Sequence, residues 1–210
     1  MRPDEALARW NARFQGDAYL FGTAPNRFLA AQAGYLQPGQ RALAIADGEG
    51  RNGVFLAKRG LKVLSVDFSP VALAKARRLA AREGVEIETE CADLAHWVWG
   101  RERFDVVAGI FIQFADAALR ARLLQGVRDA LKPGGVIFIQ GYRPEQIGYG
   151  TGGPKELDHL YTAAMLLTAF AGFHILHLAE HDEVIREGTG HDGMSALVDL
   201  VARKPKSRGA

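Results

Sequence analysis

Short apolar runs alternate with amphipathic segments through residues 37–142. The apolar runs have the length of buried strands and fall at residues 41–46, 61–67, 85–93, 103–114 and 136–142. Between them, residues 51–60, 69–84 and 117–135 place apolar side chains at helical spacing and end in glycine. Strands that alternate with helices over short links predict a parallel sheet with helices on both faces.

The pattern changes after residue 142. A glycine-rich stretch leads into an apolar helical segment at residues 161–173, and two strand-like runs follow at residues 174–186 and 195–204. Only a short, turn-rich segment separates those two runs, so they are expected to pair as an antiparallel hairpin. The predicted fold class is therefore α/β: a Rossmann-like, doubly wound, mostly parallel seven-stranded sheet with a C-terminal antiparallel hairpin.

Ahead of the sheet, residues 4–15 form an expected amphipathic helix that carries Leu7, Trp10 and Phe14 on one face, and a second short helix starts near Asn26. The length predicts one domain over residues 1–210. We divide it into a helical lid or extension (1–36), a cofactor-binding core (37–142), a substrate-side loop, helix and hairpin (143–203) and a tail (204–210).

The first strand runs into a G-x-G-x-x-G loop formed by Gly48, Gly50 and Gly53, with Asp67 19 residues beyond Gly48 at the end of the second strand. Glycines let the backbone approach a ligand closely, and the helix N-terminus offers free N–H groups. Asp67 can accept hydrogen bonds from ribose hydroxyls. Gly53 falls inside the helix, where close packing explains it better. The loop suits either a dinucleotide or an S-adenosyl group.

Four other features favour the S-adenosyl group. Asp93 ends the third predicted strand, where it can reach an adenine amino group, and "LKPGG" precedes the fifth strand. The terminal hairpin is foreign to a dinucleotide-binding domain with two mononucleotide halves. The chain also offers no second large domain for a hydride acceptor, so a nicotinamide-dependent oxidoreductase is the least favoured alternative.

Five motifs, in this order and spacing, carry a family resemblance: "WNARFQGDAYLFGTAPNRFL", "DGEGRNGVFLAKRG", "VDFSPVALAKAR", "CADL" and "LKPGG". With them the chain resembles class I S-adenosylmethionine-dependent methyltransferases over essentially its whole length. Within that superfamily it is similar to the small bacterial tellurite-resistance and thiopurine methyltransferase-like proteins. The resemblance implies S-adenosyl-L-methionine as cofactor and S-adenosyl-L-homocysteine as product. The candidate cofactor-binding residues are Asp47, Gly48, Gly50, Arg51, Asn52, Asp67, Phe68, Ser69, Asp93, Leu94 and Ile110.

The chain departs from the family at the start of the glycine loop. An acidic residue and a glycine are usual at the positions of Ala44 and Ala46. Asp47 is expected to take over part of the role of the missing acid, and Ala46 costs little if its φ is negative. The departure keeps a second hypothesis open, a non-catalytic module that binds S-adenosylmethionine or S-adenosylhomocysteine.

Methyl transfer from a sulfonium is an in-line displacement, so the enzyme mainly aligns the reactants and excludes water. An evident catalytic residue is therefore not required, and none is assigned. The substrate and lid candidates are Tyr19, Phe21, Phe111, Gln113, Tyr142 and Arg143, with Tyr19 the preferred lid contact. For Phe111 and Gln113 a buried strand end is an equal explanation, and for a lone arginine such as Arg143 a surface role is favoured. The expected partner is a small-molecule acceptor of the thiol, amine or chalcogen oxyanion class.

The composition limits the classes of partner and location that are expected, but it does not indicate a reaction. The chain is 48% hydrophobic and 24% charged, with a formal net charge of +2, and offers no apolar run that would cross a bilayer. Its basic end, residues 202–210, lacks interleaved aromatic residues, so neither nucleic acid nor a membrane is an expected partner. The single cysteine, Cys91, fits a cytoplasmic location. The histidines suggest no metal site, and monomer and homodimer both remain open.

Overall fold

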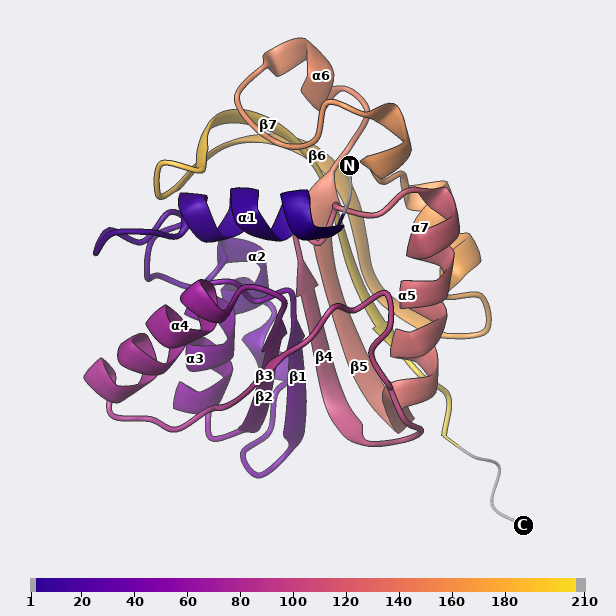
Figure 1. Ribbon diagram of the computed structural model, residues 1–210. Coiled ribbons are helices and arrows are strands. Elements are labelled where there is room, and N and C mark those ends of the chain that lie inside the picture. The colour runs from indigo at the N-terminus through magenta and orange to yellow at the C-terminus, as the bar shows by residue number, and fades with distance from the viewer. Residues whose placement is uncertain (1–2, 207–210) are drawn as a thin grey trace.

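The computed structural model describes residues 3–206, and its strands form one seven-stranded sheet in the order β3-β2-β1-β4-β5-β7-β6 (Figure 1). The first five strands are parallel, β7 is antiparallel to β5, and β6 is antiparallel to β7. The strands are β1 Arg41–Ile45, β2 Lys62–Asp67, β3 Glu88–Cys91, β4 Phe104–Ile110, β5 Leu131–Tyr142, β6 His174–Glu187 and β7 His191–Arg203. The predicted fold class is confirmed.

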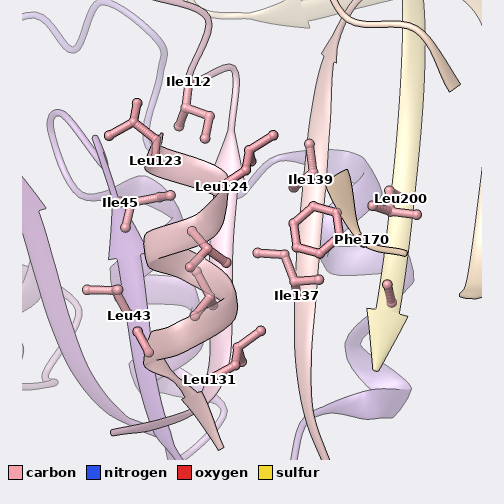
Figure 2. Close-up of a cluster of buried hydrophobic side chains, with 14 of the residues drawn as sticks. Leu43, Ile45, Ile112, Leu123, Leu124, Leu131, Ile137, Ile139, Phe170 and Leu200 are labelled. Atoms are coloured by element: carbon pink, nitrogen blue, oxygen red, sulfur yellow. The ribbon is translucent and has the colours of Figure 1, made fainter. Parts of the chain in front are cut away.

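Helices cover both faces of this sheet. They are α1 Pro3–Arg13, α2 Arg27–Ala31, α3 Arg51–Lys58, α4 Pro70–Arg82, α5 Ala117–Ala130, α6 Gln146–Tyr149 and α7 Ala163–Ala169, with 3-10 turns at η1 Ala33–Tyr35 and η2 Leu157–His159. Leu124 of α5 and Phe170, which directly follows α7, are buried against one face, as Figure 2 shows. Leu29 of α2 and Leu56 of α3 pack against the other. In Figure 1, α1 crosses the sheet at the carboxyl ends of the parallel strands.

Cross-strand pairing moves some element boundaries away from the sequence prediction. The helix expected to end at residue 135 ends at Ala130, because Leu131 already pairs with Phe104 of β4. The hairpin strands are longer than predicted, since Glu187 pairs with His191 and leaves only residues 188–190 as the turn. Cross-strand partners, distant in sequence for Leu131 and across a tight turn for Glu187, therefore set these ends, which local propensity does not encode.

Two non-glycine residues adopt left-handed backbone where adjacent strands end. Ala46 follows β1 with φ +48°, and Phe111 follows β4 with φ +55°. The condition under which Ala46 would cost little, a negative φ, is therefore not met. Left-handed backbone is unfavourable for residues with a Cβ and persists where the surrounding structure holds it in place. Both strained residues lie at the edge where a ligand binds in open α/β sheets.

Replacing Ala46 with glycine is expected to raise the free energy of unfolding by about 0.5 kcal/mol. Relief of about 1 kcal/mol of left-handed strain exceeds the extra entropy that glycine gives the unfolded chain. Ala44→Gly is the matched control: it lies within β1, has no positive φ, and should lower stability by about 1 kcal/mol. Urea unfolding of both variants measures the difference, and an equal loss in the two would contradict strain at Ala46.

Candidate functional site

The glycine loop is attached directly to the end of the neighbouring strand β2. Gly48 N–H donates to Asp67 Oδ2 at 2.8 Å, and Ser69 N–H donates to Asp67 Oδ1 at 2.9 Å. The Asp67 side chain is buried, and this burial raises its pKa above the ordinary value although the backbone donors oppose the rise. One carboxylate thus fixes both the loop after β1 and the start of α4.

Asp47 orients the same loop from the other side. Both of its carboxylate oxygens accept the Gly53 N–H of α3 at 3.2 Å, and Oδ2 also accepts the Ser65 hydroxyl of β2 at 2.8 Å. Asp47 therefore ties α3 to β2, a loop-orienting role expected when Ala44 replaces the usual acid. Burial raises the pKa of Asp47 to about 7, with the nearby Asp67 charge adding to the rise and the hydrogen bonds opposing it.

This pKa predicts a pH dependence of stability. The pKa of Asp47 in the folded protein lies above the usual aspartate value of about 3.9, so between these two values Asp47 stays protonated in the folded state while it is ionised in the unfolded state. The free energy of unfolding therefore falls as pH rises from about 4 to 7. Asp47→Asn should therefore gain at least about 1.4 kcal/mol relative to wild type between pH 5 and pH 8. Chemical unfolding at both pH values measures this, with the exposed Asp17→Asn as control. A constant difference would contradict the raised pKa.

The loop glycines differ in what surrounds them. A Cβ on Gly50, whose φ is +87°, would lie 2.6 Å from Ala76 Cβ of α4, so this glycine is required by backbone conformation and by helix packing. A Cβ on Gly53 would lie 2.4 Å from Asp47 Oδ2, which agrees with the packing role expected for it. A Cβ on Gly48 would face the Phe14 ring at 3.5 Å. Of the three glycines, Gly48 is the one beside an aromatic side chain, so helix packing does not account for it as it does for Gly50 and Gly53.

The segment between α1 and α2, residues 14–25, lies over the glycine loop and is held there by a buried ion pair. Lys75 of α4 pairs with Glu49 of the loop, and the two side chains are 1% and 3% exposed. Lys75 also donates to the carbonyls of Phe14 and Ala18, while Glu49 Oε2 accepts Leu20 N–H at 2.7 Å. We call residues 14–22 the covering segment.

The expected lid contact, Tyr19, lies elsewhere than predicted. Its hydroxyl donates to the Lys75 carbonyl at 3.1 Å, and its ring lies under the Lys75 ammonium at 4.9 Å, so Tyr19 packs on α4. Phe14, expected on the apolar face of the N-terminal helix, is buried beside Gly48. Phe21 continues the aromatic cover with ring centroids 6.4 Å from Phe14. The covering segment therefore presents Phe14 and Phe21, rather than Tyr19, to the strand ends.

At the other end of the predicted cofactor site, Asp93 is half exposed just beyond β3. Its Oδ1 accepts Ala95 N–H at 2.9 Å and its Oδ2 lies 3.1 Å from His96 Nδ1, so it caps the following turn. An open groove of about 540 Å³ is lined by Ala92, Asp93, His96 and Trp97, among others. Leu94 is buried in the core, Phe68 is partly buried, and Ser69 caps α4 and donates to Asn11 of α1.

The ends of β4 and β5 bring together residues that sequence reasoning grouped only in part. Phe111 and Tyr142 have ring centroids 4.8 Å apart. His191, the first residue of β7, lies 4.3 Å from Phe111 and 4.5 Å from Phe21 between ring centroids. Sequence reasoning named Phe21, Phe111 and Tyr142 but missed His191, which it placed in the turn of the hairpin. We call these four residues the aromatic cage.

A buried ion pair lies beside the cage. Arg51 Nη2 donates to Glu187 Oε2 at 2.7 Å, with side chains 7% and 5% exposed, so the Arg51 side chain faces the hairpin. Glu187 Oε1 accepts from Asn26 Nδ2 at 3.2 Å, and Asn52 Oδ1 accepts Asn26 N–H at 2.9 Å. Arg51 and Asn52 therefore connect the glycine-loop helix to α2 and to the hairpin. Glu187 gave no signal in the local sequence pattern.

The remaining substrate candidates are already engaged with protein groups. Gln113 Nε2 donates to the carbonyls of Tyr142 and His159, and its Oε1 accepts Tyr142 N–H, so Gln113 closes the end of β5 like a strand partner. Arg143 pairs with Asp182 and Glu145 on the outer side. Ile110 is buried in the core beneath Phe111. The structure brings Phe21, Phe111 and Tyr142 together and leaves Arg143 and Tyr19 outside that group.

Within residues 3–206, no three His, Cys, Asp or Glu side chains are grouped in a way that could hold a metal ion. Over the same range, none of the helices has both the length and the apolar character needed to span a bilayer. Cys91 is exposed and makes no disulfide.

Comparison with known proteins adds a sequence and a fold relationship. Residues 42–135, somewhat less than half of the chain, match the family described as methyltransferase domain. An uncharacterised methyltransferase of Synechocystis sp. is 30% identical over 105 residues, which are 50% of this chain and 48% of that protein. The chain thus spans less than half the length of the curated relatives it matches first.

Solved structures extend the likeness to the whole fold. The N-methyltransferase NodS of Bradyrhizobium japonicum, in complex with S-adenosyl-L-homocysteine, superposes with a TM-score of 0.71 at 15% identity and covers 96% of this chain and 98% of its own. A structure described for the conversion of a disulfide bond into a thioacetal group during echinomycin biosynthesis has a TM-score of 0.77 at 21% identity, with 98% and 92% coverage. The chain therefore has a methyltransferase fold, and its residues 42–135 are similar in sequence to a methyltransferase domain.

Proposed function

We propose that this protein is an S-adenosylmethionine-dependent methyltransferase that acts on a small-molecule acceptor of the thiol, amine or chalcogen oxyanion class. The observation that carries the proposal is the contact of Gly48 with Asp67 at the ends of β1 and β2, inside the segment similar to methyltransferase domains. The acceptor class rests on the narrower resemblance to tellurite-resistance and thiopurine methyltransferase-like proteins.

The residues at these strand ends fit the cofactor. Asp67 uses both carboxylate oxygens on backbone N–H groups, yet each oxygen keeps a further lone pair for a ribose hydroxyl. The groove lined by Ala92, Asp93 and Trp97 suits the adenine, since it begins at the end of the next strand, β3. Gly48 and the first turn of α3 would hold the methionine part, because a helix N-terminus offers N–H groups without intrahelical partners.

When bound, S-adenosylmethionine would supply a methyl group on a sulfonium sulfur. The acceptor would bond to the methyl carbon from the side opposite that sulfur, and S-adenosylhomocysteine would leave with the electron pair of the broken carbon–sulfur bond. The protein's part is alignment and exclusion of water. Asp47 and Asp67 fix the loop on two sides, and Phe14 and Phe21 cover the strand ends from the N-terminal segment. Aromatic faces near a sulfonium also attract its positive charge.

Transfer of a labelled methyl group tests the proposal directly. The purified chain is incubated with S-adenosylmethionine labelled at its methyl group and with a panel of thiols, amines and selenium or tellurium oxyanions. Label in at least one methylated acceptor, together with stoichiometric S-adenosylhomocysteine, is the expected result. Cofactor binding without turnover on the whole panel would favour the second candidate, a non-catalytic binding module, which the strained Ala46 in the glycine loop motivates.

A nicotinamide-dependent oxidoreductase has less support, since it rests on the three loop glycines alone, and Gly50 and Gly53 have packing roles. We propose that the binding partner is a small-molecule methyl acceptor and that the protein binds neither nucleic acid nor a membrane. A cytoplasmic location remains a proposal from the single cysteine of the sequence.

A further inference from the structure

A series of hydrogen-bonded polar side chains crosses the face of the sheet that α2 and α3 cover. Gln140 of β5 and Asp199 of β7 lie opposite each other, and Gln140 Nε2 donates to Asp199 Oδ1 at 2.7 Å. On its other side, Gln140 Oε1 accepts from Asn26 Nδ2 at 2.6 Å, and all three residues are buried. Asp199 Oδ2 lies 2.9 Å from Nε2 of His181, whose side chain is 34% exposed. The series therefore runs from the outer strand β6 to the start of α2.

The same series continues from Asn26 to the helix that follows the glycine loop. Asn26 Nδ2 also donates to Glu187 Oε1 at 3.2 Å, and Glu187 Oε2 accepts from Arg51 Nη2 at 2.7 Å. Arg51 is the first residue of α3 and directly follows Gly50. We call the five side chains that lead to Arg51 the polar network: His181, Asp199, Gln140, Asn26 and Glu187.

Each amide of the polar network has one orientation that satisfies its neighbours. The Asp199 carboxylate only accepts hydrogen bonds, so Gln140 must turn Nε2 toward it and offer Oε1 to Asn26. Asn26 must then turn Nδ2 toward Gln140 and Glu187, which leaves its Oδ1 to accept Leu29 N–H at 3.0 Å. Asp199 thereby sets the orientation of the side chains between it and Glu187.

Stability alone does not account for polar side chains at these positions. Val136 and Phe138 precede Gln140 on the same face of β5, and all of these neighbours belong to the apolar core. Val201, which follows Asp199 on the same face of β7, belongs to that core as well. Replacing both partners of a buried hydrogen bond with apolar groups of the same shape is nearly neutral. A fully bonded polar network does, however, rigidify the groups that it holds, and its buried end holds the Arg51 guanidinium.

Arg51 keeps one buried donor that has no hydrogen-bond partner among residues 3–206. This donor is Nη1, whereas Nη2 is bound to Glu187. Buried polar groups are ordinarily hydrogen-bonded, so the unpaired nitrogen indicates a ligand group. Guanidinium groups bind carboxylates through directional, charge-assisted hydrogen bonds. S-adenosylmethionine has one carboxylate, in its methionine part, which is the part proposed above to bind at Gly48 and the first turn of α3.

We propose that Asp199 and Gln140 are positioning residues that, through the polar network, hold the Arg51 guanidinium for the carboxylate of the cofactor's methionine part. The inference rests on the proposed function and deepens it, since it assigns one end of the cofactor to a donor that distant strands hold in place. Asp199 and Gln140 act through Arg51 rather than on the cofactor itself. Loss of either side chain therefore weakens binding of the methionine part and spares the adenosine part.

Two ligands separate the two ends of the cofactor. S-adenosylhomocysteine carries the carboxylate, whereas 5′-methylthioadenosine has the same adenosine and thioether without the amino-acid part. In Arg51→Met, calorimetry should show S-adenosylhomocysteine bound about 10- to 100-fold more weakly, the usual effect of losing a hydrogen bond to a charged group. Gln140→Leu and Asp199→Leu should each weaken it about tenfold, within the range for residues that act through a network. Affinity for 5′-methylthioadenosine should stay within about twofold of wild type in all three variants.

Three further variants test how Asp199 acts. Asp199→Asn keeps an oxygen for Gln140 Nε2, so it should recover most of the affinity for S-adenosylhomocysteine that Asp199→Leu loses. Adding Asp199→Leu to Arg51→Met should cause no further loss, because the effects of residues that act through one another are not additive. Asp105→Leu is the matched control: it removes a strand carboxylate paired with Lys132 at the opposite end of the sheet, and both affinities should stay unchanged.

Several results would overturn the inference. They are an equal loss on both ligands in a variant that still unfolds cooperatively in urea, an unchanged affinity for S-adenosylhomocysteine in Asp199→Leu, or a full further loss when Asp199→Leu is added to Arg51→Met. Gln140→Leu provides the same comparison of ligands if Asp199→Leu does not fold. A wild type that binds 5′-methylthioadenosine as tightly as S-adenosylhomocysteine would also overturn the inference, because the carboxylate would then contribute nothing. A wild type that binds neither ligand would instead overturn the proposed function, and the inference with it.

Discussion

Replacing Lys75 with methionine is expected to lower the free energy of unfolding by about 3 kcal/mol. Methionine matches the lysine stem in length but removes the ammonium, so the buried Glu49 side chain loses its charged partner and keeps only the Leu20 N–H. Breaking one side of a buried pair typically costs about 3–5 kcal/mol. The carbonyls of Phe14 and Ala18 lose a donor as well. Urea unfolding, followed by tryptophan fluorescence, measures the loss.

The same variant should loosen the covering segment, because Lys75 and Glu49 together hold residues 14, 18 and 20. Limited proteolysis of the folded protein should then cut within residues 14–22 faster than in wild type. The double variant Glu49→Gln, Lys75→Met removes both charges and should recover part of the stability. Lys58→Met, which breaks an exposed pair with Glu83, is the matched control and should cost far less than Lys75→Met, because solvent screens exposed pairs. An equal loss of unfolding free energy in Lys75→Met and Lys58→Met would contradict the role of the buried Lys75–Glu49 pair in holding the covering segment.

Replacing Asp67 with asparagine is expected to weaken S-adenosylmethionine binding about 10- to 100-fold. The reason is the loss of charged acceptors for the ribose hydroxyls, since hydrogen bonds to a charged group contribute about 1.5–3 kcal/mol. Asparagine keeps one oxygen for Gly48 or Ser69 but presents an amide to the other, so the loop also loses a contact. Isothermal titration calorimetry, at a temperature where the variant is still folded, measures the affinity.

The exposed Glu86→Gln variant provides the control for Asp67, as it makes the same change of carboxylate to amide away from the strand ends. Its affinity should equal that of wild type. If Asp67→Asn also binds with wild-type affinity, the carboxylate does not hold the cofactor, and its role is limited to the two backbone donors.

Much of the fold could be predicted from the sequence because the relevant signals are local. The apolar runs, the glycines that end the helices, and Ser69 followed by Pro70 at the start of α4 each depend on neighbours a few residues away. The ends of individual strands were less predictable. Leu131 and Glu187 extend strands through pairing with residues distant in sequence or across a tight turn, and propensity does not encode such partners.

The positions of Gly48 and Asp67 at adjacent strand ends were predictable, because each depends on the local end of one strand; their role toward a cofactor stays a prediction. Contacts between segments distant in sequence were not predictable. His191 lies in what reads as a turn, and only the fold brings it to Phe111, 80 residues earlier in the chain. Lys75 is a charged residue type that is ordinarily solvent-exposed, yet it lies on the buried side of α4 and contacts the covering segment. Tyr19 and Phe14 are both aromatic, and the backbone path of the covering segment decides which one meets the loop.

Binding of an S-adenosyl group by the loop at the end of β1 is tested most directly by calorimetric titration of the wild-type protein with S-adenosylmethionine and, separately, with NAD. We expect micromolar, one-to-one binding of S-adenosylmethionine and no detectable heat with NAD. Binding of NAD with no binding of S-adenosylmethionine would show that the loop is a dinucleotide site instead.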